Sequence, residues 1–170
     1  MNLRRPLDQL AGCGWLPRFV DKARQHLADT LPSDYRRAFG HALATDGAFL
    51  AHFQLTLADA LAAIAQAPSD EGVARWFLTQ PGVNPATIAA WNIRAPRFGE
   101  PGQPGERAFR FAMKTIYASC IDPRVNSAFT AIAWDEGYLD DLAPPAHRSS
   151  SSLASFPRTD GHPDGHTQPN

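Results

Sequence analysis

The amino-acid sequence predicts a small all-α domain, and three observations carry that prediction. Apolar side chains recur at three- and four-residue steps, the spacing that gathers them on one face of a helix. Prolines and cap residues such as Ser, Thr and Asn punctuate the chain where helices would begin and end. No run alternates as a half-buried strand does, and no Asn-Gly or Asp-Gly pair stands between two β-rich runs. We expect a single-domain bundle of about six to seven short helices.

The composition is that of one globular domain with nearly balanced charge. A chain of 170 residues with 44% apolar residues is long enough to bury a substantial core. Its 16 basic and 17 acidic residues leave a formal charge of −1, which gives no overall field to attract nucleic acid or an anionic membrane. We therefore expect no membrane partner and disfavour nucleic acid, so any anion has to bind at a local patch.

The absence of several sequence motifs indicates where the protein is located and whether it binds a cofactor. Cys13 and Cys120 show no Cys-x-x-Cys or Cys/His ligand spacing and are expected to be reduced thiols. The start of the chain has no signal-peptide apolar region, and no window approaches about 18 uninterrupted apolar residues. We expect a cytoplasmic protein without a cofactor.

Helix starts and stops follow from proline and cap residues. Pro17 suits the first turn of a helix, and the Leu31-Pro32 step stops that helix because the residue before proline disfavours helical angles. The predicted helices are residues 16–30, 46–53, 57–66, 70–78, 86–94, 106–119 and 125–134. We expect residues 1–14 and 33–41 to be irregular, and the Pro/Gly-rich residues 96–105 to form a loop.

The composition changes abruptly near the end of the chain. Residues 3–143 have the apolar content of a folded domain. Residues 144–170 are rich in Ser, Pro, Gly and His and cannot bury enough apolar surface to offset their ordering entropy. The sequence therefore predicts a helical domain over 3–143 and a disordered tail over 144–170.

The first helix combines an apolar stripe with a ladder of charges. The predicted apolar face is Leu16, Phe19, Val20, Ala23, Leu27 and Leu31, and the predicted polar face is Arg18, Asp21, Lys22, Gln25 and Asp29. Arg18 and Arg24 stand three residues on either side of Asp21, so they could clamp its carboxylate and keep it ionised. This suits an anion site in which Arg18 or Lys22 holds the anion and Asp21 orients it. The alternative is a solvated charge ladder.

A second basic face lies further along the chain. Arg107, Arg110 and Lys114 follow one another at steps of three and four residues, and Arg94 and Arg97 stand just across the predicted loop. Guanidinium groups match phosphate or carboxylate oxygens in pairs, so this face could hold such a group. The nearby aromatic residues Phe98, Phe111 and Tyr117 could stack on a ring. The alternative is an ordinary solvated face.

Two aromatic residues with polar neighbours are candidates for the edge of a pocket. Trp91 is followed by Asn92, and Trp134 is followed by Asp135 and Glu136. In a site, Trp91 would form an apolar wall and Asp135 or Glu136 could act as a general base. The alternative is a normal core edge, since a buried indole needs a polar partner.

The histidines form no convincing metal motif. His26, His41 and His52 lack a His-x-x-x-His or His-Glu-x-x-His pattern, and the His-x3-His spacing of His162 and His166 falls in the predicted tail. We expect no metal site. The chain also lacks a Gly-rich phosphate loop, a nucleophile elbow and a Cys nucleophile motif, so whether it is an enzyme stays open.

A series of short segments carries a family resemblance. The segments are Leu16-Pro17-Arg18, Asp21-Lys22-Ala23-Arg24, Leu31-Pro32 with Asp34-Tyr35, Ser69-Asp70-Glu71 with Trp76, Trp91-Asn92 and Asp135-Glu136-Gly137. In this order and spacing, over about residues 7–140, the chain resembles the bacterial domain-of-unknown-function 5069 family. The resemblance implies a helical fold and a bacterial source, and it implies no reaction.

The resemblance has two departures around the Trp-Asn element. In the family a Gly-Arg-type turn precedes this element and an Arg-Gly-Trp-Arg-Asp-like segment follows it. Here residues 81–85 read Pro-Gly-Val-Asn-Pro and residues 97–100 read Arg-Phe-Gly-Glu. If the missing groups belong to a site, the resemblance implies that this chain has altered or lost it.

These candidates lead to two functional hypotheses. The first is binding, with or without turnover, of a small anionic or polar metabolite in a cleft between the first helix and the segment after Trp91. Its candidate ligand-binding residues are Arg18, Asp21, Lys22, Trp91, Asn92, Arg107 and Arg110. The alternative is a non-catalytic interaction module that docks a partner protein through exposed aromatic residues such as Phe98 and Phe111. The oligomeric state is not predicted by the sequence.

Overall fold

The computed structural model describes residues 3–142, in which a short hairpin precedes eight α-helices. The hairpin pairs β1 (Gln9–Leu10) with β2 (Cys13–Gly14) in antiparallel register. The helices are α1 (Leu16–Leu27), α2 (Ser33–Ala38), α3 (Thr45–His52), α4 (Leu57–Gln66), α5 (Asp70–Leu78), α6 (Pro85–Arg94), α7 (Glu106–Thr115) and α8 (Ala128–Asp135). Two 3-10 helices, η1 (Ala95–Arg97) and η2 (Leu139–Leu142), follow α6 and α8. The predicted tail lies outside the described residues.

The fold is mostly helical, as predicted, but it is not strictly all-α. Residues predicted to be irregular form the β1–β2 hairpin instead, and the helices outnumber the prediction. The hairpin turn is made by Ala11 and Gly12, whose φ angles are 53° and 74°. Two-residue turns with positive φ at both positions match the twist of paired strands. Ala-Gly is a weaker turn signal than Asn-Gly, and strands of two residues are too short to show alternation.

Several helix boundaries differ from the predicted ones. α1 ends at Leu27 rather than near Thr30, and α7 ends at Thr115 rather than Ser119. The stretch 33–41 contains α2, which the sequence did not predict. α8 begins after Ser127, whose hydroxyl accepts from the Thr130 amide while Thr130 Oγ1 accepts from the Ser127 amide. This reciprocal capping box fixes the start of α8 three residues later than expected, at Ala128 instead of Val125.

Three other predicted helix starts are confirmed by their caps. The Thr56 hydroxyl accepts from the Asp59 amide at 3.1 Å and begins α4. Ser69 accepts from the Gly72 amide at the start of α5. Asn84 accepts from the Ala86 and Thr87 amides and precedes Pro85, the first residue of α6. Local cap chemistry therefore sets these boundaries.

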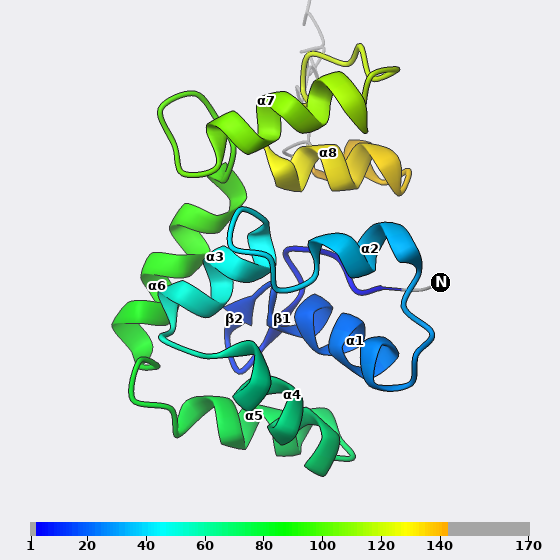
Figure 1. Ribbon diagram of the computed structural model, residues 1–170. Coiled ribbons are helices and arrows are strands. Elements are labelled where there is room, and N and C mark those ends of the chain that lie inside the picture. Colours follow the sequence, from blue (N-terminus) through cyan, green and yellow to red (C-terminus); the bar gives the residue numbers. More distant parts are fainter. Residues whose placement is uncertain (1–2, 143–170) are drawn as a thin grey trace, which may run out of the picture.

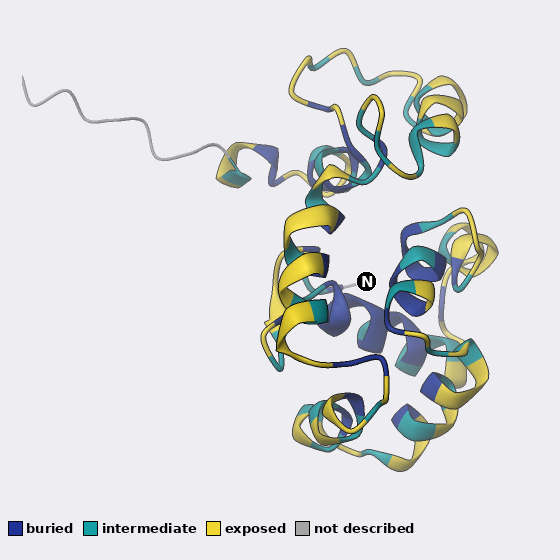
Figure 2. Cartoon of the chain, turned by 90° about the vertical axis from the view of Figure 1, so that its left-hand side faces the viewer, coloured by how far each residue is buried: buried dark blue, intermediate teal, exposed yellow. Residues whose placement is uncertain are grey.

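The helices form a body and a smaller layer at one end (Figure 1). In the body, α1 packs against α4, α4 against α5, and α6 against β2 and α3. In Figure 1, α7 and α8 lie across one end of this body, α4 and α5 lie at the other, and α6 runs along the side. Figure 2 shows that the outer surface of α6 is exposed, whereas buried residues line the helices behind it.

The main core is built from aromatic rings of several helices. Phe19, Phe49, Phe53, Phe77 and Trp91 are all buried, and Phe49 contacts each of the other four at ring-centroid distances of 5.1–6.1 Å. Such tilted and edge-on contacts are favourable beyond the area they bury. This cluster joins α1, α3, α5 and α6 into the body.

A second apolar cluster holds the α7–α8 layer together. Val125, Ala131, Ala133, Tyr138 and Leu139 form its buried part, and side chains of α7 such as Phe109 and Met113 pack on it. Ile116 follows the last residue of α7 and is 72% exposed, so it does not join this cluster.

No single helix among residues 3–142 is long and apolar enough to cross a membrane. α3 and α4 together reach the required length and composition, but they meet at 88°.

Candidate functional site

Arg18 lies buried at the junction of α1 and the end of α8. Its side chain is 1% exposed, and its Nη1 and Nη2 donate to the two carboxylate oxygens of Glu136 at 3.1 and 2.5 Å. Nη1 also donates to the Arg4 carbonyl, and the Tyr35 hydroxyl donates to Glu136. Burial alone would lower the pKa of Arg18, but the Glu136 carboxylate outweighs it and the pKa is raised. Both terminal nitrogens of the guanidinium therefore donate to protein groups.

Lys22 is also buried and is paired with Asp46 of α3. The ammonium lies 2.5 and 2.6 Å from the two Asp46 oxygens, and Asp46 also accepts from the indole nitrogen of Trp15 at 2.9 Å. Lys22 Nζ is 4.6 Å from the Trp15 ring centroid and 5.9 Å from that of Phe39. Burial lowers the pKa of Lys22, and the Asp46 charge opposes this shift. The aromatic rings complete a closed cage around the ammonium.

Trp15, which precedes α1, adopts a strained backbone conformation at this cluster. Its φ angle is 69°, a value that a bulky L residue rarely adopts. The Trp15 amide donates to the Pro6 carbonyl at 2.9 Å while the indole is held by Asp46. These two contacts hold the conformation in place.

Asp21 is held by Arg4, which the sequence did not single out. The Arg4 backbone amide and guanidinium donate to the Asp21 carboxylate at 2.6–3.1 Å. Arg4 also donates to Asp70 of α5, to which Arg24 donates at 2.7 Å. The predicted clamp of Asp21 between Arg18 and Arg24 is therefore wrong, because both arginines turn to carboxylates on other elements.

The first helix thus has no solvated charge ladder. Arg18 and Lys22, predicted on the polar face, are buried, whereas Leu27, predicted in the apolar face, is 46% exposed. Leu27 is the last residue of α1, and the carboxylates of Asp46 and Glu136 let Lys22 and Arg18 enter the interior.

Trp91 and Asn92 hold the hairpin against α6. The Trp91 indole donates to the Gly14 carbonyl at 2.9 Å, and Asn92 accepts from the Gly14 amide at 2.9 Å and donates to the Gly12 carbonyl at 2.8 Å. Trp91 is buried in the main core against Phe49. Its ring is therefore a core element, and the two side chains together hold Gly12 and Gly14 of the hairpin against α6.

The basic residues of α7 lie apart from this network. Arg107, Arg110 and Lys114 line an open hollow of about 340 Å³ together with Phe111, which is 68% exposed. Within residues 3–142, Arg107 and Lys114 make no ion pair, and Arg110 reaches only Glu106, at 3.6 Å. We call this surface the α7 hollow. It gathers the predicted site residues Arg107 and Arg110, whereas Arg18, Asp21 and Lys22 form the α1 network, and Trp91 and Asn92 hold the hairpin.

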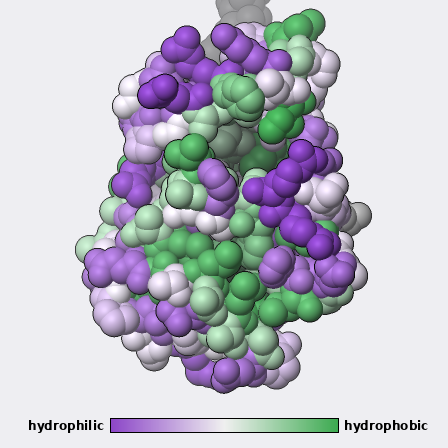
Figure 3. All heavy atoms as spheres, viewed as in Figure 1, coloured by the Kyte–Doolittle hydropathy of each residue, from purple (hydrophilic) through white to green (hydrophobic). Residues whose placement is uncertain are grey.

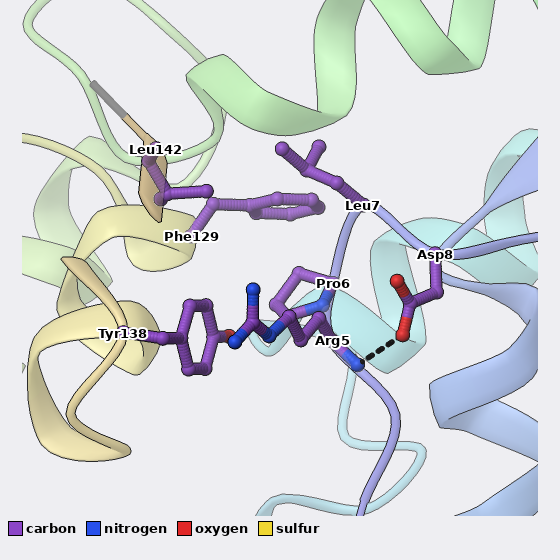
Figure 4. Close-up of a pocket in the computed structure, with 7 residues that line it drawn as sticks. All are labelled: Arg5, Pro6, Leu7, Asp8, Phe129, Tyr138 and Leu142. Atoms are coloured by element: carbon purple, nitrogen blue, oxygen red, sulfur yellow. Dashed lines mark hydrogen bonds between the residues drawn. The ribbon is translucent and has the colours of Figure 1, made fainter. Parts of the chain in front are cut away.

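Another pocket lies between the start of the chain and the α7–α8 layer, and we call it the seam pocket (Figure 4). Its volume is about 160 Å³, and its lining residues are Arg5, Pro6, Leu7, Asp8, Phe129, Tyr138 and Leu142. The surface view is hollowed between the α7–α8 layer and the body, with hydrophobic residues showing in the hollow (Figure 3). The Arg5 guanidinium carbon lies 4.4 Å from the Tyr138 ring centroid.

Sequence reasoning missed the residues that complete these sites. Asp46 is 24 residues from Lys22, and Arg4 is 66 residues from Asp70. Arg5 and Tyr138 meet only because the first residues fold back onto η2. No local spacing signals such contacts. Burial raises the pKa of the Cys13 thiol to about 12, which keeps this buried cysteine protonated.

Comparison with known proteins gives a family without an assigned activity. A search of curated proteins finds no match to the chain. A family model described as a domain of unknown function, DUF5069, matches residues 1–138, which is most of the chain. The match covers the hairpin, α1 to α8 and the Glu136 carboxylate that binds Arg18. The chain therefore belongs to the DUF5069 family.

Proposed function

We propose that this domain binds a small anionic metabolite, and that the α7 hollow is the place where it binds. One observation carries the proposal: three cations of a single helix surround an exposed aromatic ring. Arg107, Arg110 and Lys114 stand four residues before, one before and three after Phe111, so all four share one side of α7. The combination offers both charge and a stacking surface to one ligand.

The state of the cations decides between the candidate sites. Arg18 and Lys22 are already neutralised by Glu136 and Asp46, and bringing an anion to them would require breaking buried ion pairs. The cations of the α7 hollow have no such cost, because within the described residues only Arg110 contacts a carboxylate, at 3.6 Å. These contacts favour α7 as the anion site and a structural role for the α1 network.

The chemistry of the hollow favours a ligand with a ring and a phosphate or carboxylate. Guanidinium groups bind such oxygens in pairs, and an exposed phenyl face stacks on another ring. A volume of about 340 Å³ lies within the range of small-molecule sites. Phenyl phosphate is the simplest probe that carries both groups, with phenol and inorganic phosphate as its two halves.

The test is a titration of the full chain with these three probes, followed by NMR. Phenyl phosphate is expected to shift amide signals around residues 107–114, with a weaker response to each half alone. Arg107→Gln should weaken binding about tenfold, the loss of one charge-assisted contact. Arg37→Gln is the matched control, because Arg37 is 81% exposed on α2 and lies outside the hollow. If Arg107→Gln and Arg37→Gln bind the probe as the native chain does, the proposal fails.

The alternative function is docking of a partner protein, and the apolar surface near α7 favours it. Phe111, Ile116 and Ile121 are 68%, 72% and 94% exposed. Exposed apolar side chains of this kind are commonly covered by a partner protein. Phe98, which the sequence also suggested as an exposed docking residue, is half-buried. A partner site would be lost in Ile116→Ser and Ile121→Ser, which should leave phenyl phosphate binding unchanged. If the domain binds a small molecule instead, substitution of Arg107 or Lys114 should weaken phenyl phosphate binding, and substitution of the two isoleucines should not.

A further inference from the structure

We propose that the seam pocket is a separate binding site for a small uncharged molecule with a flat apolar body and a carbonyl group. The site lies on another part of the molecule from the α7 hollow and does not depend on the function proposed for it. Three features carry the assignment: a buried hydroxyl without a partner among residues 3–142, apolar walls from two parts of the fold, and a charge balance that disfavours anions.

The hydroxyl of Tyr138 provides the polar contact. Tyr138 is 8% exposed, and among residues 3–142 its hydroxyl is one of two buried side-chain polar atoms without a hydrogen-bond partner. Figure 4 shows its hydroxyl end directed across the pocket toward Arg5 and Pro6. Buried polar groups almost always have a partner, so an acceptor is expected for this hydroxyl. The hydroxyl oxygen is itself enclosed, so the acceptor of a ligand reaches it only when a lining side chain moves aside. Burial, followed by the Glu136 charge, raises the pKa of Tyr138, and the hydroxyl therefore keeps its proton and donates.

The walls of the pocket are apolar and come from residues near the beginning and near the end of the described sequence. Pro6 and Leu7 form one side, and Phe129 and Leu142 form the other (Figure 4). A cavity of about 150 Å³ holds one benzene ring, so the seam pocket, at about 160 Å³, suits a single ring. The Phe129 ring packs against Trp15 in a tilted arrangement, with ring centroids 5.1 Å apart, which holds this wall in place.

The charges around the pocket favour a neutral ligand. Arg5 is the cation of the lining, and its Nη2 lies 2.8 Å from the Asp141 carboxylate. Asp8 adds a second negative charge, and its carboxylate accepts from the Arg5 amide at 2.7 Å. One positive and two negative charges repel a carboxylate or phosphate. A carbonyl oxygen keeps the hydrogen bond from Tyr138 without this repulsion.

Benzamide and benzoate form a matched pair of probes, because they share a ring and a carbonyl and differ in charge. With the labelled full chain, benzamide is expected to shift amide signals of residues 5, 7, 8, 129 and 138–142 while those of α7 stay unchanged. Benzoate should bind at least several-fold more weakly. Tyr138→Phe should weaken benzamide binding three- to tenfold, the usual effect of losing one neutral hydrogen bond. Tyr35→Phe, which removes a hydroxyl outside the pocket lining, should leave it unchanged.

A second variant keeps the test independent of Tyr138. Leu7 is 48% exposed, so Leu7→Trp is tolerated by the fold and places an indole in the pocket, which should abolish benzamide binding. Absence of benzamide shifts at millimolar concentration would mean that water alone fills the pocket, and the proposal would be overturned. Equal affinity for benzoate and benzamide, or full affinity in Tyr138→Phe, would overturn it as well.

Discussion

The cations of α1 and those of α7 belong to helices of similar sequence pattern, yet their surroundings are opposite. Arg18 and Lys22 are buried, and each contacts both oxygens of one carboxylate from a distant segment of the chain. Arg107 and Lys114 are exposed, and neither makes an ion pair within the part of the chain that the structure describes. Charge spacing along a helix therefore does not distinguish an internal tie from a binding surface.

The difference follows from which partner reaches the helix. α3 brings Asp46 to Lys22, and the end of α8 brings Glu136 to Arg18. α7 uses its apolar side to pack on α8, and among residues 3–142 no carboxylate from another helix pairs with its cations. A buried cation is a cost that the fold has to offset, whereas an unpaired surface cation leaves charge available to a ligand. The next four predictions test this division, from the largest expected change in stability to the smallest.

Removal of the Asp46 carboxylate should have the largest effect on stability. Asp46→Ala leaves the Lys22 ammonium buried without its counter-charge and the Trp15 indole without its acceptor. Breaking a buried pair in this way typically costs about 3–5 kcal/mol. Urea unfolding followed by tryptophan fluorescence measures the loss. Adding Lys22→Met should recover much of it, and a double variant as unstable as the single one would contradict the assignment of an ion-pair tie.

Glu136→Gln should have a smaller effect, because Glu136 is partly exposed. Its side chain is 23% exposed and water can partly replace its contacts, but Arg18 remains buried opposite it. We expect a loss of about 1–3 kcal/mol in the free energy of unfolding. Glu100→Gln is a close control, because the Glu100 side chain is 24% exposed but pairs with the exposed Arg97. This variant should lower the free energy of unfolding by less than about 0.5 kcal/mol. Equal losses in the two variants would contradict a special role for the Arg18 pair.

Much of the fold could be predicted from the sequence, because local chemistry sets it. The cap residues Thr56, Ser69 and Asn84 begin helices where predicted, since a side-chain oxygen three residues before an amide acts without help from distant segments. The hairpin was missed because its stability comes from Trp91 and Asn92, about 80 residues away.

The candidate site was predicted less well, for the same physical reason. The sequence identified Arg18 and Lys22 as important charges, but whether they face water or carboxylates depends on α3 and α8, which no spacing within α1 can reveal. Arg107, Arg110 and Phe111 were predicted to lie near one another because they share one helical face, and the structure places them along one hollow. The small-molecule function, the cytoplasmic location and the bacterial source remain predictions.

The Asp70 carboxylate gives the pH-dependent part of the α1 network. Burial alone would raise the pKa of Asp70, but hydrogen bonds from Arg4 and Arg24 lower it below its ordinary value. A carboxylate with a lower pKa in the folded state stabilises the protein above the unfolded pKa and loses this contribution as the pH falls through the folded one. Urea unfolding between pH 6 and pH 2.5 should therefore show a term below about 1 kcal/mol that disappears in Asp70→Asn. An unchanged pH dependence in this variant would contradict the role of the two arginines.

The α7 hollow should respond in the opposite way, with almost no change in stability and a clear change in binding. Arg107→Gln and Lys114→Gln remove cations that hold no partner among the described residues, so each should change the free energy of unfolding by less than about 0.5 kcal/mol. The same variants should each bind phenyl phosphate about tenfold more weakly, and native binding should weaken further as salt screens the charges. If either variant unfolds as readily as Asp46→Ala, its cation is a structural tie after all, and the two helices differ in exposure but not in role.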